Sequence, residues 1–235
     1  MPDVIADLTT AEGRAALIDG VTRLSQGGIE GVVANAGGGA PEVSLSLNFF
    51  GAVATLEGLR PLLVTSPAPR AVAVSSVAAL RPPARALVEA CLKMNESAAN
   101  AAAREAKNGK LDPGDGDAPG DAEVGLALYG AAKHALHLWC RSAATNPEWA
   151  GAGIPLNVVA LGFFDTPAAA YILSDPASRA AMGRLAPLRG AFPGRPEEAA
   201  AALAWCVSAE NSQMTGQILY IDAGIECLAR AERSP

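Results

Sequence analysis

The sequence has few charged and few aromatic residues. Only 18% of its 235 residues are Asp, Glu, Lys or Arg and 5% are Phe, Trp or Tyr, whereas half are hydrophobic. So low a charge content argues against a disordered chain, and the many Ala and Gly residues favour an α/β protein whose helices pack closely on a buried sheet. The length suits one domain over residues 1–235 with a full hydrophobic core.

Clusters of basic residues, paired cysteines and long apolar runs are also missing. The net charge is −6 and no stretch gathers Lys and Arg, so nucleic acid is not an expected partner. No signal peptide opens the chain and no uninterrupted apolar run could span a membrane, which predicts a cytoplasmic protein without a membrane partner. The four cysteines lack C-x-x-C or metal-ligand spacing, so we expect free thiols and no metal: Cys91, Cys140, Cys206 and Cys227.

What the sequence does contain is an alternation of predicted strands and helices, the pattern of a parallel sheet with right-handed crossovers. Strands are predicted at residues 3–7, 31–35, 71–75, 156–160 and 218–221. Helices are predicted from a cap at Thr9 or Thr10 to about residue 24, and at 45–63, 129–144 and 196–208.

A segment over residues 81–121 interrupts this alternation and is predicted to be an insert. Its first part, 84–107, has helical composition, whereas 108–120 is rich in Gly, Asp and Pro and indicates a solvated loop. The spacing of Asp112, Asp115 and Asp117 is superficially that of a calcium loop, but the later bidentate Glu is absent.

The pair Tyr129 and Lys133 is the first candidate for chemistry. Residues four apart share one face of a helix, and we expect this pair at the start of one. A nearby ammonium favours the phenolate, so it lowers the tyrosine pKa and makes the phenol a practical proton donor and acceptor near neutral pH. Taken alone, the same spacing fits a surface tyrosine beside a solvated lysine.

Several further motifs occur in order, and together they resemble the classical short-chain dehydrogenase/reductase family over nearly the whole chain. Ser75-Ser76-Val77 ends a strand as the family's catalytic serine does, and the match falls on Ser76. The other matching stretches are Ala34-Asn35-Ala36-Gly37, Leu47-Asn48-Phe49-Phe50-Gly51, Asn157 to Gly162 with Asp165-Thr166-Pro167, and Thr215-Gly216-Gln217 with Asp222-Ala223-Gly224.

The resemblance implies a Rossmann-like, doubly wound parallel sheet and an oxidoreductase that uses NAD or NADP, with NAD favoured. Ser76 would hydrogen-bond the substrate oxygen, and Tyr129 would exchange a proton with it as hydride moves to or from the nicotinamide. Lys133 would lower the Tyr129 pKa and bind the nicotinamide ribose, and Asn48 would help hold a water chain. Further cofactor contacts are implied for Asp7, Leu8, Asn35, Ala36, Gly37, Gly162, Phe164 and Thr166.

Within the family, the sequence looks most like bacterial 3α-hydroxysteroid dehydrogenase/carbonyl reductases. That resemblance implies a hydrophobic ketone or secondary alcohol as substrate, with a steroid as one candidate, and a homodimer or homotetramer. The insert before Tyr129 would form part of a substrate lid.

The family's opening strand and its T-G-x-x-x-G-I-G turn, which lets the backbone approach a pyrophosphate, have no match here. Relative to the family the first two strands and the first helix are missing, so residues 31–35 would form a hydrophobic sheet edge. Three explanations stay open: a truncated or mis-started version of a complete enzyme, direct pairing of strand 3–7 with 31–35, or another chain that covers the edge.

Two other functions stay open as well. One is a non-redox isomerase, lyase or cyclase that uses Tyr129 and Lys133 as an acid/base pair; the other is a catalytically silent member that acts as a partner subunit.

His134 and His137 are three apart on the same helix as Lys133, but further metal ligands cannot be placed, so helix packing or surface exposure is the better interpretation.

Overall fold

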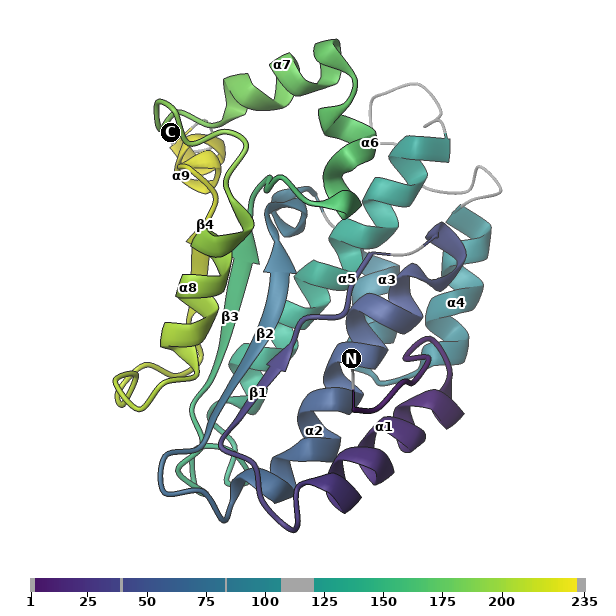
Figure 1. Cartoon of the computed structure of the whole chain (residues 1–235). Helices are drawn as coiled ribbons and strands as arrows, with labels where there is room; N and C mark the ends of the chain where they lie inside the picture. Colours follow the sequence, from purple (N-terminus) through teal and green to yellow (C-terminus); the bar gives the residue numbers. More distant parts are fainter. Residues whose placement is uncertain (1–2, 39, 83, 107–120, 232–235) are drawn as a thin grey trace.

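The structure is a computed structural model that describes residues 3–38, 40–82, 84–106 and 121–231 (Figure 1). The predicted solvated loop at 108–120, with Asp112, Asp115 and Asp117, lies outside the described residues. In the described part no helix is long and apolar enough to cross a membrane.

A four-stranded parallel sheet forms the centre of the protein, as the alternating pattern predicted. The strands are β1 (Gly31–Ala34), β2 (Arg70–Ser76), β3 (Leu156–Leu161) and β4 (Ile218–Ile221), and this is also their order across the sheet. The register places Ala34 opposite Ala73, Ser76 opposite Leu161, and Leu161 opposite Ile221. Because every pair is parallel, the strands all end at one edge of the sheet.

The predicted strand at 3–7 is wrong. These residues are irregular, and among the described residues β1 pairs only with β2. The Asp7 carboxylate accepts hydrogen bonds from the N–H and hydroxyl of Thr9, the Asp7 carbonyl accepts from the N–H of Thr10, and the Arg14 guanidinium donates to the carbonyl of the next residue, Leu8. The segment therefore packs against the first helix, and the direct pairing of 3–7 with 31–35 does not occur.

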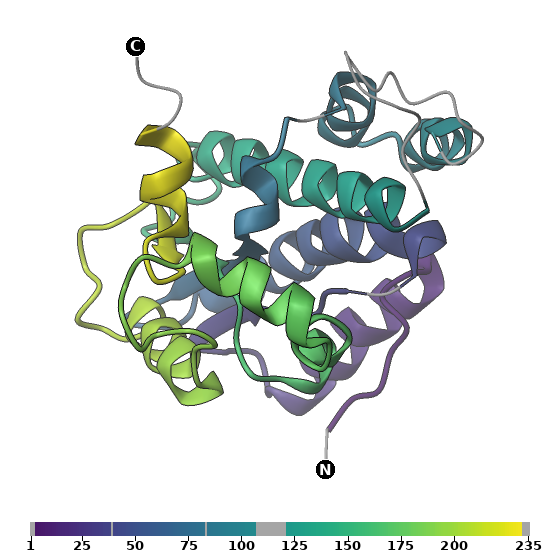
Figure 2. The ribbon, with the colours of Figure 1, turned by 90° about the horizontal axis from the view of Figure 1, so that it is seen from above.

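One face of the sheet is covered by α2 (Ala52–Leu63) and α5 (Asp121–Ala143), with α1 (Ala11–Leu24) packed outside α2 (Figures 1 and 2). Thr10 caps α1, as predicted, because its hydroxyl accepts from the N–H of Gly13. The predicted helix at 45–63 is divided into a π-helical turn, η2 (Ser46–Gly51), and α2.

Helix α5 begins eight residues before Tyr129, so the prediction that Tyr129 starts a helix is wrong. The buried side chains of Val124 and Leu128 extend the apolar stripe of α5 toward its N-terminus at helical spacing. Gly125 lies under the Pro41 ring, which leaves no room for a larger side chain without movement. Tyr129 therefore lies inside a long helix, which the buried Val124 and Leu128 and the close contact of Gly125 with Pro41 hold in place.

The insert forms two helices, α3 (Arg85–Leu92) and α4 (Glu96–Glu105), and α3 packs on α5. The opposite face of the sheet is covered by α8 (Pro196–Cys206), as predicted. Three helices were not predicted. They are α6 (Ala170–Leu173) and α7 (Pro176–Leu185), which lie beyond the ends of the strands (Figures 1 and 2), and α9 (Ile225–Ala231), which follows β4.

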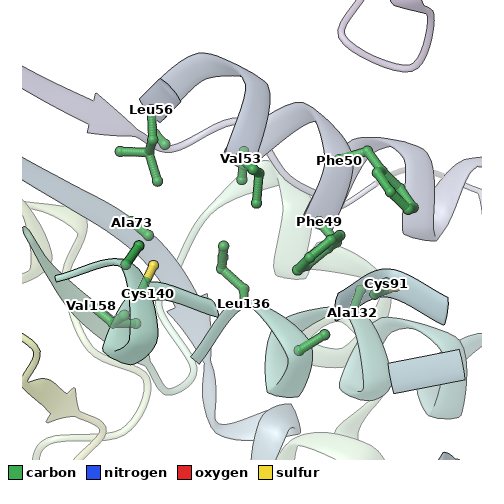
Figure 3. Packing of buried hydrophobic residues seen from close by; sticks show 14 of the residues in the cluster. Phe49, Phe50, Val53, Leu56, Ala73, Cys91, Ala132, Leu136, Cys140 and Val158 are labelled. Carbon is green, nitrogen blue, oxygen red and sulfur yellow. The ribbon is translucent and has the colours of Figure 1, made fainter. Parts of the chain in front are cut away.

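The main hydrophobic core lies between the sheet and helices α2 and α5 (Figure 3). Phe49, Leu136 and Val158 reach it from η2, α5 and β3 and are almost fully buried. A smaller cluster of Val72, Val159 and Cys206 lies under α8, which confirms that Cys206 is a buried small side chain. All four cysteines are free thiols.

Candidate active site

The predicted site residues gather where the strands end. Asn35 follows β1, Ser76 is the last residue of β2, and Gly162 follows β3 directly. The register sets Ser76 opposite Leu161, so Ser76 and Gly162 are close neighbours along this edge. Three segments far apart in the sequence therefore meet at one place, as expected for the carboxyl edge of a parallel sheet.

Tyr129 and Lys133 lie together on α5, as their spacing predicted. The Lys133 Nζ lies 5.7 Å from the centroid of the Tyr129 ring and donates a hydrogen bond of 2.8 Å to the Val74 carbonyl. The Lys133 side chain is 2% exposed, and this burial lowers the pKa of its ammonium to about 8. The Lys133 ammonium thus lies against the half-buried ring of Tyr129, and its effect on the Tyr129 phenol stays a prediction.

Ser75 and Ser76 have different environments because successive side chains of a strand point to opposite faces. Ser76 is half-buried, and its hydroxyl caps η3 (Val77–Leu80) by accepting from the N–H of Ala78 at 3.2 Å. Ser75 is buried and its hydroxyl lies 2.7 Å from Nε2 of His137. Ser75 is therefore engaged inside the fold, and the role of Ser76 as the serine that meets a substrate stays a prediction.

Asn48 is fully buried in η2 and fixes the loop that follows β1. Its Oδ1 accepts from the N–H of Gly38, and its Nδ2 donates to the carbonyls of Gly38 and Ser44. Gly37 lies between Asn48 and Lys133, because a Cβ there would come within 3.0 Å of Asn48 Oδ1 and 3.4 Å of Lys133 Nζ. The water-chain role of Asn48 stays a prediction.

A groove of about 340 Å³ extends from this loop along β1. The predicted cofactor residues Leu8, Asn35 and Ala36 all line it. Asp7 lies beside Leu8 in the chain, but its carboxylate already accepts two hydrogen bonds from Thr9, which hold the pKa of Asp7 below its usual value.

Gly162, Phe164 and Thr166 form the other flank of the site, after β3. Gly162 approaches β4 so closely that a Cβ would lie 2.7 Å from the Asp222 Cα. Phe164 forms an isolated bridge with Gly194 and lines a small apolar cavity of about 220 Å³, and Thr166 begins the short helix η5 (Pro167–Ala169). The sheet register places this flank beside Ser76, since Leu161, the residue before Gly162, lies opposite Ser76.

Sequence reasoning missed two contacts of this site. His137 binds Ser75, and Nδ1 of His134 lies 3.1 Å from the Ala79 carbonyl. The prediction that these histidines serve helix packing is confirmed for His137, which is 5% exposed. Within the described ranges no group of three His, Cys, Asp or Glu side chains is arranged to hold a metal.

The chain is similar to known proteins over most of its length. The family described as Enoyl-(Acyl carrier protein) reductase matches residues 120–226. The 3-alpha-hydroxysteroid dehydrogenase/carbonyl reductase of Comamonas testosteroni is 32% identical over 232 residues, which are 97% of this chain and 84% of that protein.

Two solved structures have the same fold. The 3-alpha-hydroxysteroid dehydrogenase of Pseudomonas sp. B-0831 complexed with NADH superposes with a TM-score of 0.82 at 31% identity, covering 99% of this chain and 86% of that chain. RhlG of Pseudomonas aeruginosa, in an active-site complex with NADP, has a TM-score of 0.66 at 25% identity and covers 94% and 74%.

Proposed function

Because this chain belongs to the short-chain dehydrogenase/reductase family, and is an oxidoreductase of that family, we propose that it transfers hydride between a nicotinamide cofactor and a hydrophobic ketone or secondary alcohol. A steroid is a candidate substrate, since the relative from Comamonas testosteroni is named for one. We propose NAD rather than NADP as the cofactor, a homodimer or homotetramer as the assembly, and the cytoplasm as the location.

The observation that carries this proposal is that α5, which carries Tyr129 and buried Lys133, packs on the chain on both sides of Ser76: Lys133 donates to Val74, and Gly130 approaches the Ala78 carbonyl. Ser76 would donate a hydrogen bond to the substrate oxygen, and Tyr129 would give that oxygen a proton during reduction or remove one during oxidation. Lys133 would keep the Tyr129 pKa low enough for both directions near neutral pH, since its charge lies within 6 Å of the ring. A bound nicotinamide would supply or accept the hydride.

The residues present fit the nicotinamide end of such a cofactor. Gly37 leaves open the space next to Lys133 that a Cβ would fill, and the Lys133 ammonium borders that space. Lys133 donates to Val74, and an ammonium has three donors, so two further donors are available for ribose hydroxyls.

An apolar substrate fits the elements that lie beyond the strand ends. Helices α6 and α7 and the chain after them cross this region, and their side chains Leu185 and Leu188 are 42% and 63% exposed. Exposed large apolar side chains next to an active site are typical of a surface that binds a hydrophobic ligand.

A second candidate function is a non-redox isomerase, lyase or cyclase. The observation in its favour is that these 235 residues contain no T-G-x-x-x-G-I-G turn, the feature that gives a dinucleotide its pyrophosphate site. Acid/base chemistry by Tyr129 and Lys133 would need no such site.

Replacing Tyr129 with Phe tests both candidates, because Phe keeps the ring and removes the hydroxyl. We measure the rate of carbonyl reduction as the loss of NADH absorbance. We expect this rate to fall by roughly 10²-fold or more, as is typical when a general acid is removed. A matched variant, Tyr220→Phe on β4, should retain activity because it keeps the ring and removes only a hydroxyl that interacts with Arg230 of α9. Turnover that needs Tyr129 but no nicotinamide would favour the non-redox function, and full activity in Tyr129→Phe would contradict both.

A further inference from the structure

Helix α5 holds the chain around Ser76 through three of its side chains. Lys133 donates to the Val74 carbonyl at 2.8 Å, His137 bonds the Ser75 hydroxyl at 2.7 Å, and His134 bonds the Ala79 carbonyl at 3.1 Å. The two histidine contacts bracket Ser76, one residue before it and three residues after it. Ser76 therefore cannot shift along α5 without loss of one of these bonds.

The backbone of α5 is also in direct contact with this segment. A Cβ on Gly130 would lie 2.8 Å from the Ala78 carbonyl oxygen, so only glycine allows the helix to come so close to η3. Gly130 follows Tyr129 in the chain. The close contact between α5 and η3 therefore occurs next to Tyr129.

The side chains of His134 and His137 are each held in one orientation by their contacts. The Ala79 carbonyl can only accept, so Nδ1 of His134 must carry a proton and donate it. The His137 ring meets the ring of Tyr220 on β4 edge-on, with centroids 6.3 Å apart and an interplanar angle of 83°. His137 is thus held between β2 and β4, and its orientation is set on two sides.

A serine bonded to a histidine is also half of a hydrolytic site, but that reading does not fit here. Ser75 is 3% exposed and His137 is 5% exposed, so a substrate carbonyl cannot reach the Ser75 hydroxyl. A metal site does not fit either, because His134 and His137 bind different partners and point to a serine and a carbonyl.

We propose that His134 and His137 are positioning residues, which set the place of Ser76 relative to Tyr129 for the proposed reaction. They touch neither substrate nor cofactor and act through Ala79 and Ser75. The inference rests on the proposed function, because a fixed distance between Ser76 and Tyr129 matters only if both groups act on one substrate oxygen. A displacement of about 1 Å of such a group can cost up to about 10²-fold in rate.

The variants that test this separate the hydrogen bond from the shape of the ring. His137→Leu and Ser75→Ala each remove one partner of the same bond, whereas His137→Gln and His134→Asn keep a donor near Nε2 and Nδ1 respectively. Arg141→Ala is the matched control, since Arg141 is exposed on the same helix, two turns beyond Lys133. Each folded variant is assayed for carbonyl reduction over a range of substrate and NADH concentrations.

We expect His137→Leu and Ser75→Ala to lower kcat by roughly tenfold, with the KM for NADH within about twofold of wild type, because the group that they displace acts on the substrate oxygen. The double variant should be no slower than the slower single variant, because both remove one bond. His137→Gln and His134→Asn should recover most of the rate. Unchanged kcat in both His137→Leu and Ser75→Ala would falsify the positioning role, as would additive losses or a failure of both conservative variants to recover activity.

A second measurement decides the proposal without turnover. Amide hydrogen exchange over residues 75–80 should be faster in His134→Leu and His137→Leu than in wild type and in Arg141→Ala, because the removed bonds hold that segment on α5. Equal exchange in all four proteins would overturn the inference even in an active enzyme. If the wild-type chain shows no nicotinamide turnover, the proposed function fails, and the exchange result alone decides whether the histidines fix the segment.

Discussion

Burial controls the charge of His137. Its pKa falls to about 3, first because burial disfavours the charged ring and then because His134, Lys133 and Arg230 are positive neighbours. The unfolded chain binds this proton near pH 6.5 and the folded protein only near pH 3, so the unfolded state holds more protons between those values. Stability is therefore full above pH 6.5 and is lost as the pH falls toward 3.

Urea unfolding at two pH values measures this effect. Between pH 7 and pH 5 we expect His137 alone to remove about 2 kcal/mol from the free energy of unfolding. His137→Gln has no ring to protonate, so its unfolding free energy should fall by correspondingly less over the same interval. An identical fall in both proteins would mean that His137 is protonated in the folded state as easily as in the unfolded one.

The sequence predicted some residues of the site and missed others for a simple physical reason. Tyr129 and Lys133 are four apart, so their proximity follows from helical geometry alone. The partners of His134 and His137 lie 55 and 62 residues away in the chain, and no local pattern indicates such contacts. Motif matching to a family found Ser76 because the family carries that information, whereas Ser75 and Ala79 have no motif.

At the scale of elements, the distance between α5 and η3 depends on Gly130. We expect Gly130→Ala to force the helix away from the Ala78 carbonyl, to lower the free energy of unfolding by about 1–3 kcal/mol, and to reduce kcat because Tyr129 moves with the helix. Gly125→Ala on the same helix is the control: its Cβ would meet only the Pro41 ring at 3.2 Å. Thermal unfolding and carbonyl reduction compare the two variants, and equal effects would contradict a special role for Gly130.

Helices and strands could be predicted where their burial in the core leaves a clear apolar pattern in the sequence. Strands β2 and β3 are buried along almost their whole length, so they appear in the sequence as apolar runs, and both were predicted within one residue at each end. Helices α6 and α7 have little buried surface and no clear apolar stripe, so no helix was predicted there. Residues 3–7 contain a short apolar run, Val4 to Ala6, that suits a strand, but contacts with α1 decide their conformation.

At the scale of the whole molecule, the sheet has an apolar edge where the sequence predicted one. Strand β1 is the last strand on its side within the described residues, and the exposed fraction of Val33 on it is 39%. The prediction followed from comparison with the family, whose first two strands and first helix have no match in these 235 residues. The groove beside this edge runs toward the loop that holds Gly37.

This arrangement leads to a prediction about how much of the binding free energy of a dinucleotide comes from its nicotinamide end and how much from its diphosphate and adenine. The nicotinamide end would meet Lys133 and Gly37, whereas the predicted contacts for the distant end are Asp7 and Leu8, and the Asp7 carboxylate is already bonded to Thr9. Since these 235 residues contain no T-G-x-x-x-G-I-G turn, the diphosphate should add little binding free energy.

Calorimetry of this chain with NADH and with reduced nicotinamide mononucleotide, which lacks the adenylate half, measures that division. We expect the two Kd values to agree within about tenfold, a difference below about 1.4 kcal/mol. Gly37→Val should weaken both ligands alike, because its side chain would enter the space beside Lys133, and Asp7→Ala should affect neither ligand strongly. NADH binding more than about 100-fold tighter than the mononucleotide would contradict this division, because a preference that large requires a diphosphate or adenine site within these residues.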